Sequence, residues 1–178
     1  MYPSKYAAAH PDRAAFIMAS TGESVSYVEF EARANKLTHL LQNEGLGRQD
    51  HYSIMMENNN RYLEACAAGE RAGLYYTCIN SFLTADELAY ILDNSESQIL
   101  ITSMSKLEVA IDAVAQSSKV RKVLVVDADA NELPDGFEDY ATTCQSFPAT
   151  PIDNERLGTS MLYSSGTTGR PKGIIRPL

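Results

Sequence analysis

The chain has 178 residues, of which 44% are hydrophobic and 21% are charged. This length corresponds to one domain, at about 150 residues per domain, and the composition excludes a disordered tail. Fifteen basic residues against 23 acidic ones give a net charge of −8. A chain this acidic, with no run of basic residues, is not expected to bind nucleic acid through the phosphate backbone.

The cysteines and the N-terminus indicate the compartment. Cys66, Cys78 and Cys144 are far apart, odd in number and form no C-x-x-C motif. They predict neither a disulfide framework nor a zinc site, and favour reduced thiols. The N-terminus lacks the apolar core of a signal peptide, and no window approaches the ~18 apolar residues of a membrane span. We therefore expect a cytoplasmic protein without a transmembrane segment.

Three helices are predicted by one start signal, a Ser or Thr followed three residues later by Glu, which is a capping box. The pairs are Ser26 with Glu29, Thr84 with Glu87, and Ser105 with Glu108. The first of these helices, over 27–44, repeats apolar residues at spacings of four, three and four, and Gly45 ends it. A further helix over 61–72 ends at Gly73.

Short runs suited to buried strands alternate with these helices. They cover residues 14–18, 52–56, 75–79, 98–102, 122–126 and 160–163. The alternation predicts an α/β fold with a mostly parallel sheet and crossover helices. Residues 127–153 are acidic, contain three prolines, and show little periodicity beyond a short helix near 137–144. We interpret this stretch as a surface excursion that joins the last crossover to the final strand.

Glycines and hydroxyl side chains gather in residues 163–173, which read Y-S-S-G-T-T-G-R-P-K-G. Glycines bring backbone N–H groups close to an anion, while the hydroxyls and a lysine add further donors, so this run suits a polyphosphate. It is not a Walker A loop, because Pro171 precedes the lysine and Gly173 follows it, nor is it a G-x-G-x-x-G fingerprint. The alternative is a flexible surface loop rich in small polar residues. The predicted phosphate-binding residues are Ser164, Ser165, Gly166, Thr167, Thr168, Gly169 and Lys172.

The order of residues 164–173 resembles the phosphate-binding signature of the adenylate-forming superfamily, which includes acyl-CoA synthetases, firefly luciferase and the adenylation domains of peptide synthetases. The resemblance extends over nearly the whole chain, from H-P-D-R-A-A at 10–15 to the segment 73–88. Cys78 and Ser81 stand where the family usually has prolines, and the residues after Gly173 also depart from its pattern.

The resemblance implies a fold and a reaction. Residues 1–178 are expected to be the N-terminal α/β subdomain of a larger AMP-binding domain, an incomplete part of the adenylate-forming fold that ends just after the phosphate loop. The parent enzyme is expected to activate a carboxylic acid, such as a fatty acid, with ATP and Mg²⁺, and to transfer the acyl group to CoA. Because the family's catalytic and metal-binding residues lie downstream, we expect none of them here, and an inactive chain on its own. The alternatives are a peptide-synthetase adenylation domain, an aryl-acid ligase, or a non-catalytic nucleotide-binding α/β module.

Three other candidate sites are less specific. Residues 103–106 fit S-x-x-K, the nucleophile motif of penicillin-binding enzymes, but its companion motifs are missing and we interpret Ser105 as a helix cap. His10, His39 and His51 are scattered and are not expected to bind a metal or act in catalysis. Cys66 lies among alanines and is interpreted as a core residue.

The end of the chain carries a separate expectation. Ile174 and Ile175 are β-branched and follow the glycine-rich run directly, so they are suited to a strand. We expect them to pair with a strand near 160–163 or with a neighbouring chain. A sheet left open at its edge would also favour self-association.

Overall fold

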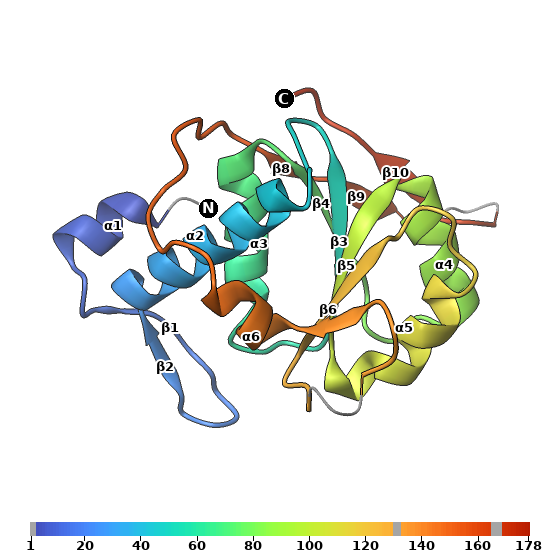
Figure 1. Ribbon diagram of the computed structural model, residues 1–178, viewed down its shortest axis with the longest axis horizontal. Helices are drawn as coiled ribbons and strands as arrows, with labels where there is room; N and C mark the ends of the chain where they lie inside the picture. Colours follow the sequence, from blue (N-terminus) through green and yellow to red (C-terminus); the bar gives the residue numbers. More distant parts are fainter. Residues whose placement is uncertain (1–2, 130–132, 165–168) are drawn as a thin grey trace.

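The computed structural model describes residues 3–129, 133–164 and 169–178. Its centre is a six-stranded sheet in the order β7-β6-β5-β3-β4-β8, in which every pair of neighbours is parallel (Figure 1). The strands are β3 (His51–Met55), β4 (Tyr75–Cys78), β5 (Ser97–Ser103), β6 (Lys122–Val126), β7 (Phe137–Asp139) and β8 (Thr159–Ser160). This sheet confirms the predicted α/β class.

Helices cover both faces of the sheet. On one side lie α2 (Tyr27–Asn43), α3 (Tyr62–Ala72) and α6 (Tyr140–Gln145), and on the other α4 (Ala85–Asn94) and α5 (Leu107–Val114) (Figure 1). Successive residues of β5 serve the two cores in turn. Ile99 packs beneath α2 and α3, whereas Leu100 packs beneath α4 and α5. A strand that is buried on both faces has a continuous apolar run in its sequence, and such a run predicted this strand.

Two of the three predicted capping boxes are present. The Ser26 hydroxyl accepts a hydrogen bond from the Glu29 backbone N–H, and the Glu29 carboxylate accepts one from the Ser26 N–H. The same reciprocal pair joins Thr84 and Glu87 at the start of α4. Helix α3 ends at Gly73, whose φ of 71° lies in the left-handed region that glycine tolerates best.

The prediction of a third capping box, Ser105 with Glu108, was wrong. Helix α5 begins at Leu107, after a 3-10 turn, η1 (Met104–Lys106), and the residue before α5 makes no side-chain cap. The Ser105 hydroxyl donates instead to Glu57 Oε2, 2.6 Å away, just beyond the end of β3. The Ser105 side chain is therefore bonded to a residue distant in sequence and does not cap α5.

The interpretation of 127–153 as a surface excursion was also wrong in part. Residues 137–139 add the edge strand β7 to the sheet, with Phe137 opposite Val123. Helix α6 follows at once and buries Tyr140 and Cys144, which lie four residues apart and so share one helical face. The segment completes the core beneath α2 instead of passing over the surface.

Three further elements frame this unit. Helix α1 (Ser4–Ala9) places the Tyr6 ring 5.4 Å from that of Tyr27, and β1 (Ala14–Ile17) pairs antiparallel with β2 (Ser24–Ser26) outside the main sheet.

Among residues 3–129, 133–164 and 169–178, no helix has the length and apolar character to cross a bilayer.

The predicted strand at 160–163 is divided in two. Thr159–Ser160 form β8 in the main sheet, and Leu162–Ser164 form β9, which pairs antiparallel with β10 (Lys172–Ile174). The buried Met161 lies at the break. Ile174 therefore pairs with a strand as predicted, whereas Ile175 lies beyond the end of β10.

Candidate polyphosphate site

The two ends of the glycine-rich run lie side by side. In the β9–β10 hairpin Lys172 is opposite Ser164 and Gly173 is opposite Tyr163. The predicted residues Ser165, Gly166, Thr167 and Thr168 lie outside the described residues. The pairing brings together a hydroxyl group, from Ser164, and an ammonium group, from Lys172, at the two ends of the run.

The described members of the predicted site are exposed. The φ of Gly169 is 130°, a conformation that other residues rarely adopt, so a glycine is required at this position. Ser164 and Lys172 are also exposed, and the lysine forms no ion pair with another described residue. An ammonium group without a carboxylate beside it is available to a phosphate.

Helix α4 holds the hairpin in place. The Tyr90 hydroxyl donates to the Pro171 carbonyl oxygen at 3.1 Å, and the guanidinium carbon of Arg170 lies 4.9 Å from the centre of the Tyr90 ring. One turn further along α4, the Asn94 amide oxygen accepts a hydrogen bond of 2.7 Å from the Tyr163 hydroxyl. Burial raises the pKa of Tyr163 to about 12, so this phenol keeps its proton at neutral pH. Both strands of the hairpin are thus fixed to one helix.

Two glycines near this site serve packing and not phosphate binding. A Cβ on Gly158 would collide with the carbonyl oxygens of Gly69 and Leu74, where the chain passes between α3 and β4. A Cβ on Gly173 would meet the Met161 side chain and lie 3.1 Å from the Tyr163 ring.

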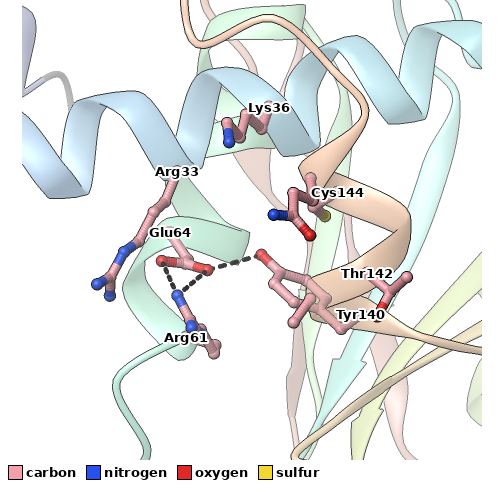
Figure 2. A pocket seen from close by; sticks show the side chains of 9 residues that line it. Arg33, Lys36, Arg61, Glu64, Tyr140, Thr142 and Cys144 are labelled. Carbon is pink, nitrogen blue, oxygen red and sulfur yellow. Dashed lines mark hydrogen bonds and ion pairs between the residues drawn. The ribbon is translucent and has the colours of Figure 1, made fainter. Parts of the chain in front are cut away.

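A pocket lies between α2, α3 and α6, on the opposite face of the sheet from α4 (Figure 2). Its volume is about 340 Å³, and Arg33, Lys36 and Arg61 bring three cationic side chains to its lining. Figure 2 shows the buried carboxylate of Glu64 between Arg61 and Tyr140, with a 3.4 Å ion pair to Arg61 and a 2.9 Å hydrogen bond from the Tyr140 hydroxyl.

The Glu64 carboxylate on α3 accepts a hydrogen bond from Tyr140 on α6 and so links the two helices. Burial raises the pKa of Glu64, and the charge of Arg61 opposes that shift. Burial likewise raises the pKa of Tyr140, so the phenol remains a donor to the carboxylate. The sequence reasoning missed this network because it placed residues 127–153 on the surface. The spacing of four residues between Tyr140 and Cys144, which places both on one helical face, was the available signal.

The S-x-x-K motif at 103–106 does not form a nucleophilic site. The hydroxyls of Ser103 and Ser105 both donate to Glu57 Oε2, each at 2.6 Å. Burial raises the pKa of Glu57, but these two hydrogen bonds, together with others from the Glu57 backbone and the Asn59 side chain, outweigh it and the pKa is lowered. The Lys106 ammonium lies over the face of the Phe82 ring, 5.3 Å from its centre.

The histidines and acidic groups offer no metal centre within the part of the chain that the structure describes. His39 Nε2 lies 2.9 Å from the Thr150 carbonyl oxygen, and the His51 ring stacks on Tyr75 at 4.8 Å with its pKa lowered by burial. No group of three or more His, Cys, Asp or Glu side chains gathers there in a form that could hold a metal ion. We therefore assign no Mg²⁺ ligand among these residues.

The parallel sheet and the signature-bearing hairpin together define the class of protein. Residues 4–177 match the family model described as AMP-binding enzyme, and the chain belongs to this family. A 3-oxocholest-4-en-26-oate–CoA ligase from Rhodococcus rhodochrous is 31% identical over 170 residues, which make up 93% of this chain and 30% of that protein. A medium/long-chain-fatty-acid–CoA/3-oxocholest-4-en-26-oate–CoA ligase from Mycobacterium marinum is 29% identical over 174 residues, covering 93% of this chain and 31% of that protein.

A solved structure shows the same fold. The crystal structure of an anthranilate CoA ligase in complex with anthranoyl-AMP superposes with a TM-score of 0.81 at 20% identity, over 97% of this chain and 33% of that one. The predicted membership of the adenylate-forming superfamily is confirmed, and the sheet and its helices are part of that fold. The chain spans about 30% of the length of the curated relatives named above.

Proposed function

We propose that this chain is the N-terminal, polyphosphate-binding part of an AMP-forming acyl-CoA synthetase. In this reaction a carboxylate attacks the α-phosphorus of ATP and releases pyrophosphate, and the CoA thiol then displaces AMP from the acyl adenylate. The observation that carries the proposal is the β9–β10 hairpin, which places Ser164 and Lys172 opposite each other at the two ends of the signature. Membership of the AMP-binding family supports it.

The role we assign to the loop is electrostatic. Negative charge grows on the departing pyrophosphate as its bond to the α-phosphorus breaks, and donors already aimed at that charge lower the barrier. The Lys172 ammonium is the charged donor, while the hydroxyls and backbone N–H groups of the run supply neutral ones. The residues proposed to contact the β- and γ-phosphates are Ser164, Ser165, Gly166, Thr167, Thr168, Gly169 and Lys172.

The acid we propose is a fatty acid. Support comes from the Mycobacterium marinum relative, whose name includes medium/long-chain-fatty-acid–CoA ligase. The fold shared with an anthranilate CoA ligase keeps an aryl acid as the second candidate. Mg²⁺ enters the proposal as the partner of ATP, with no ligand assigned to it in this chain.

Pyrophosphate exchange tests this proposal in the full-length protein that contains these residues. The protein is incubated with ATP, labelled pyrophosphate and, in separate reactions, a fatty acid, an aryl acid or an amino acid. CoA is added afterwards and AMP release is measured.

Exchange that requires a fatty acid, followed by CoA-dependent AMP release, supports the proposal. Exchange without CoA-dependent release would indicate a peptide-synthetase type of enzyme. ATP binding without exchange for any acid would indicate a non-catalytic module and contradict the proposal.

A further inference from the structure

Two cysteines that are twelve residues apart in sequence lie in contact. Cys66 Sγ and Cys78 Sγ are 3.8 Å apart, within reach of the ~2.05 Å disulfide bond after a small side-chain rotation. Helix α3 crosses over between the parallel strands β3 and β4 and so runs opposite to them. For this reason the first half of α3, which contains Cys66, lies beside the far end of β4, where Cys78 is the last residue.

The two thiols differ in their access to solvent. Cys78 is exposed, whereas Cys66 is half-buried and packs against the core beneath α3. A reagent in solution therefore meets Cys78 first, with Cys66 directly behind it. The third cysteine, Cys144, is a buried residue of α6.

The hydrogen bonds around the pair separate the chemical roles of the two sulfurs. The hydrogen bond from Cys66 lowers the pKa of Cys78 to about 7, burial opposes this shift, and a hydrogen bond with Tyr62 adds to it. The hydrogen bond to Cys78 and burial together raise the pKa of Cys66. At neutral pH a substantial fraction, about half, of the exposed sulfur is thus thiolate, the form of cysteine that reacts with oxidants, and its neighbour keeps the proton.

We propose that Cys66 and Cys78 are a redox-active dithiol that hydroperoxides convert to an intramolecular disulfide. The Cys78 thiolate attacks one oxygen of hydrogen peroxide, the O–O bond breaks, and the hydroxide that leaves takes up a proton to become water. The resulting sulfenic acid is attacked by the Cys66 sulfur. The S–O bond then breaks, and the departing hydroxide takes the Cys66 proton to form a second water. Two thiols lose two electrons in total, and one peroxide is reduced to two waters.

The cysteine pair lies at the C-terminal end of β4, where Cys78 is the last residue. The N–H of Ile79, the residue after Cys78, donates a hydrogen bond of 2.8 Å to the Ile54 carbonyl oxygen of β3. Cys78 therefore lies at the end of the β3–β4 pairing. A disulfide would tie α3 to this end of β4 covalently. Thiol–disulfide exchange with a dithiol reductant would reverse it.

Peptide mapping of the reduced full-length protein after one equivalent of hydrogen peroxide tests the proposal. Free thiols are then alkylated, and the digest is analysed by mass spectrometry. We expect a peptide pair linked through Cys66 and Cys78 that has lost two hydrogens, together with loss of alkylation at both residues and recovery of both after dithiothreitol. Cys144→Ser is the matched control and should form the same link.

The single variants separate the two steps. In Cys66→Ser the oxidation should stop at a Cys78 sulfenic acid, which a cyclic diketone traps, whereas Cys78→Ser should leave Cys66 open to alkylation. Two results would overturn the proposal in the wild-type protein, whether or not the variants fold. One is a Cys78 sulfinic acid with Cys66 still free, and the other is a disulfide that joins two molecules only.

Discussion

The hydroxyl group of Tyr90 on α4 donates a hydrogen bond to the carbonyl oxygen of Pro171, 3.1 Å away. The same ring lies beneath the guanidinium of Arg170, at 4.9 Å. A residue from the second helix layer thereby holds the segment that leads from the glycine-rich run into β10. If that run binds the phosphates of ATP, this contact positions it without touching the nucleotide.

Replacing Tyr90 by Phe removes the hydrogen bond and keeps the ring. A hydrogen bond of this kind contributes about 0.5–1.5 kcal/mol, so we expect the KM for ATP to rise about 2- to 10-fold in the full-length enzyme. The control is Tyr6→Phe, because the Tyr6 side chain is exposed on α1, away from the hairpin. Equal KM values for both variants and the wild type would show that the contact does not position the loop.

The Arg71 side chain is fully buried, and its two terminal nitrogens bind the two carboxylate oxygens of Glu31 at 2.9 and 2.8 Å. Removing the charge of Glu31 leaves a buried cation with weaker compensation, and such changes cost about 3–5 kcal/mol. We expect Glu31→Gln to lower the free energy of unfolding by about 3 kcal/mol, since Glu155 at 3.9 Å retains part of the compensation.

Urea denaturation measures this effect. The control is Glu96→Gln, which neutralises one member of the exposed Lys119–Glu96 pair and should change the free energy by less than about 1 kcal/mol. A Glu31→Gln change as small as that of the control would mean that the buried pair does not stabilise the α2–α3 contact.

The reactivity of Cys78 should depend on pH. Its pKa of about 7 means that the thiolate fraction, and with it the rate of alkylation by iodoacetamide, rises through neutral pH. Tyr62→Phe removes a hydrogen bond that lowers this pKa, so the midpoint should move to higher pH and the rate at pH 6.5 should fall. Cys144, whose pKa burial raises to about 12, is the internal comparison and should stay unreactive in the folded protein. A Cys78 midpoint near pH 9 would contradict the lowered pKa.

The 178-residue chain by itself should neither form an acyl adenylate nor consume ATP. A phosphate loop supplies only part of the positioned charge that adenylation requires, and the proposed function assigns the rest to other parts of a longer protein. Carboxylate-dependent pyrophosphate release from the purified chain is measured against its Lys172→Ala variant. Release above that background would refute this expectation.

Local signals predicted local structure well. Ser26 with Glu29, and Thr84 with Glu87, needed only their own backbone to form capping boxes, and both are present. Ser105 carried the same signal, but it lies in the turn η1, where its hydroxyl donates to the Glu57 carboxylate, 48 residues earlier in the chain. No local pattern reveals such a partner, because it depends on the parallel pairing of β3 with β5.

Weak periodicity hid strand β7 in the acidic stretch, whereas the short helix predicted near 137–144 is present as α6. Strand β7 has only three residues, and its partly buried side chains show no alternation between buried and exposed. In the candidate site, the pairing of Ile174 was predictable from its β-branched side chain, whereas its register opposite Leu162 is known only from the structure. The support from Tyr90 and Asn94 was not predictable, since it joins α4 to residues some 70 to 80 positions later.

The central claim is that Lys172 neutralises phosphate charge, and the steady-state kinetics of pyrophosphate exchange against ATP concentration in the full-length enzyme test it most directly. Loss of one charge-assisted contact should cost about 1.5–3 kcal/mol, so Lys172→Ala should lower kcat/KM for ATP about 10- to 150-fold. Thr167→Val should lower it less, because it removes a neutral donor. Lys119→Ala, which removes a half-exposed lysine from a surface ion pair, should leave it unchanged. Wild-type kinetics in both Lys172→Ala and Thr167→Val would remove the loop from the mechanism.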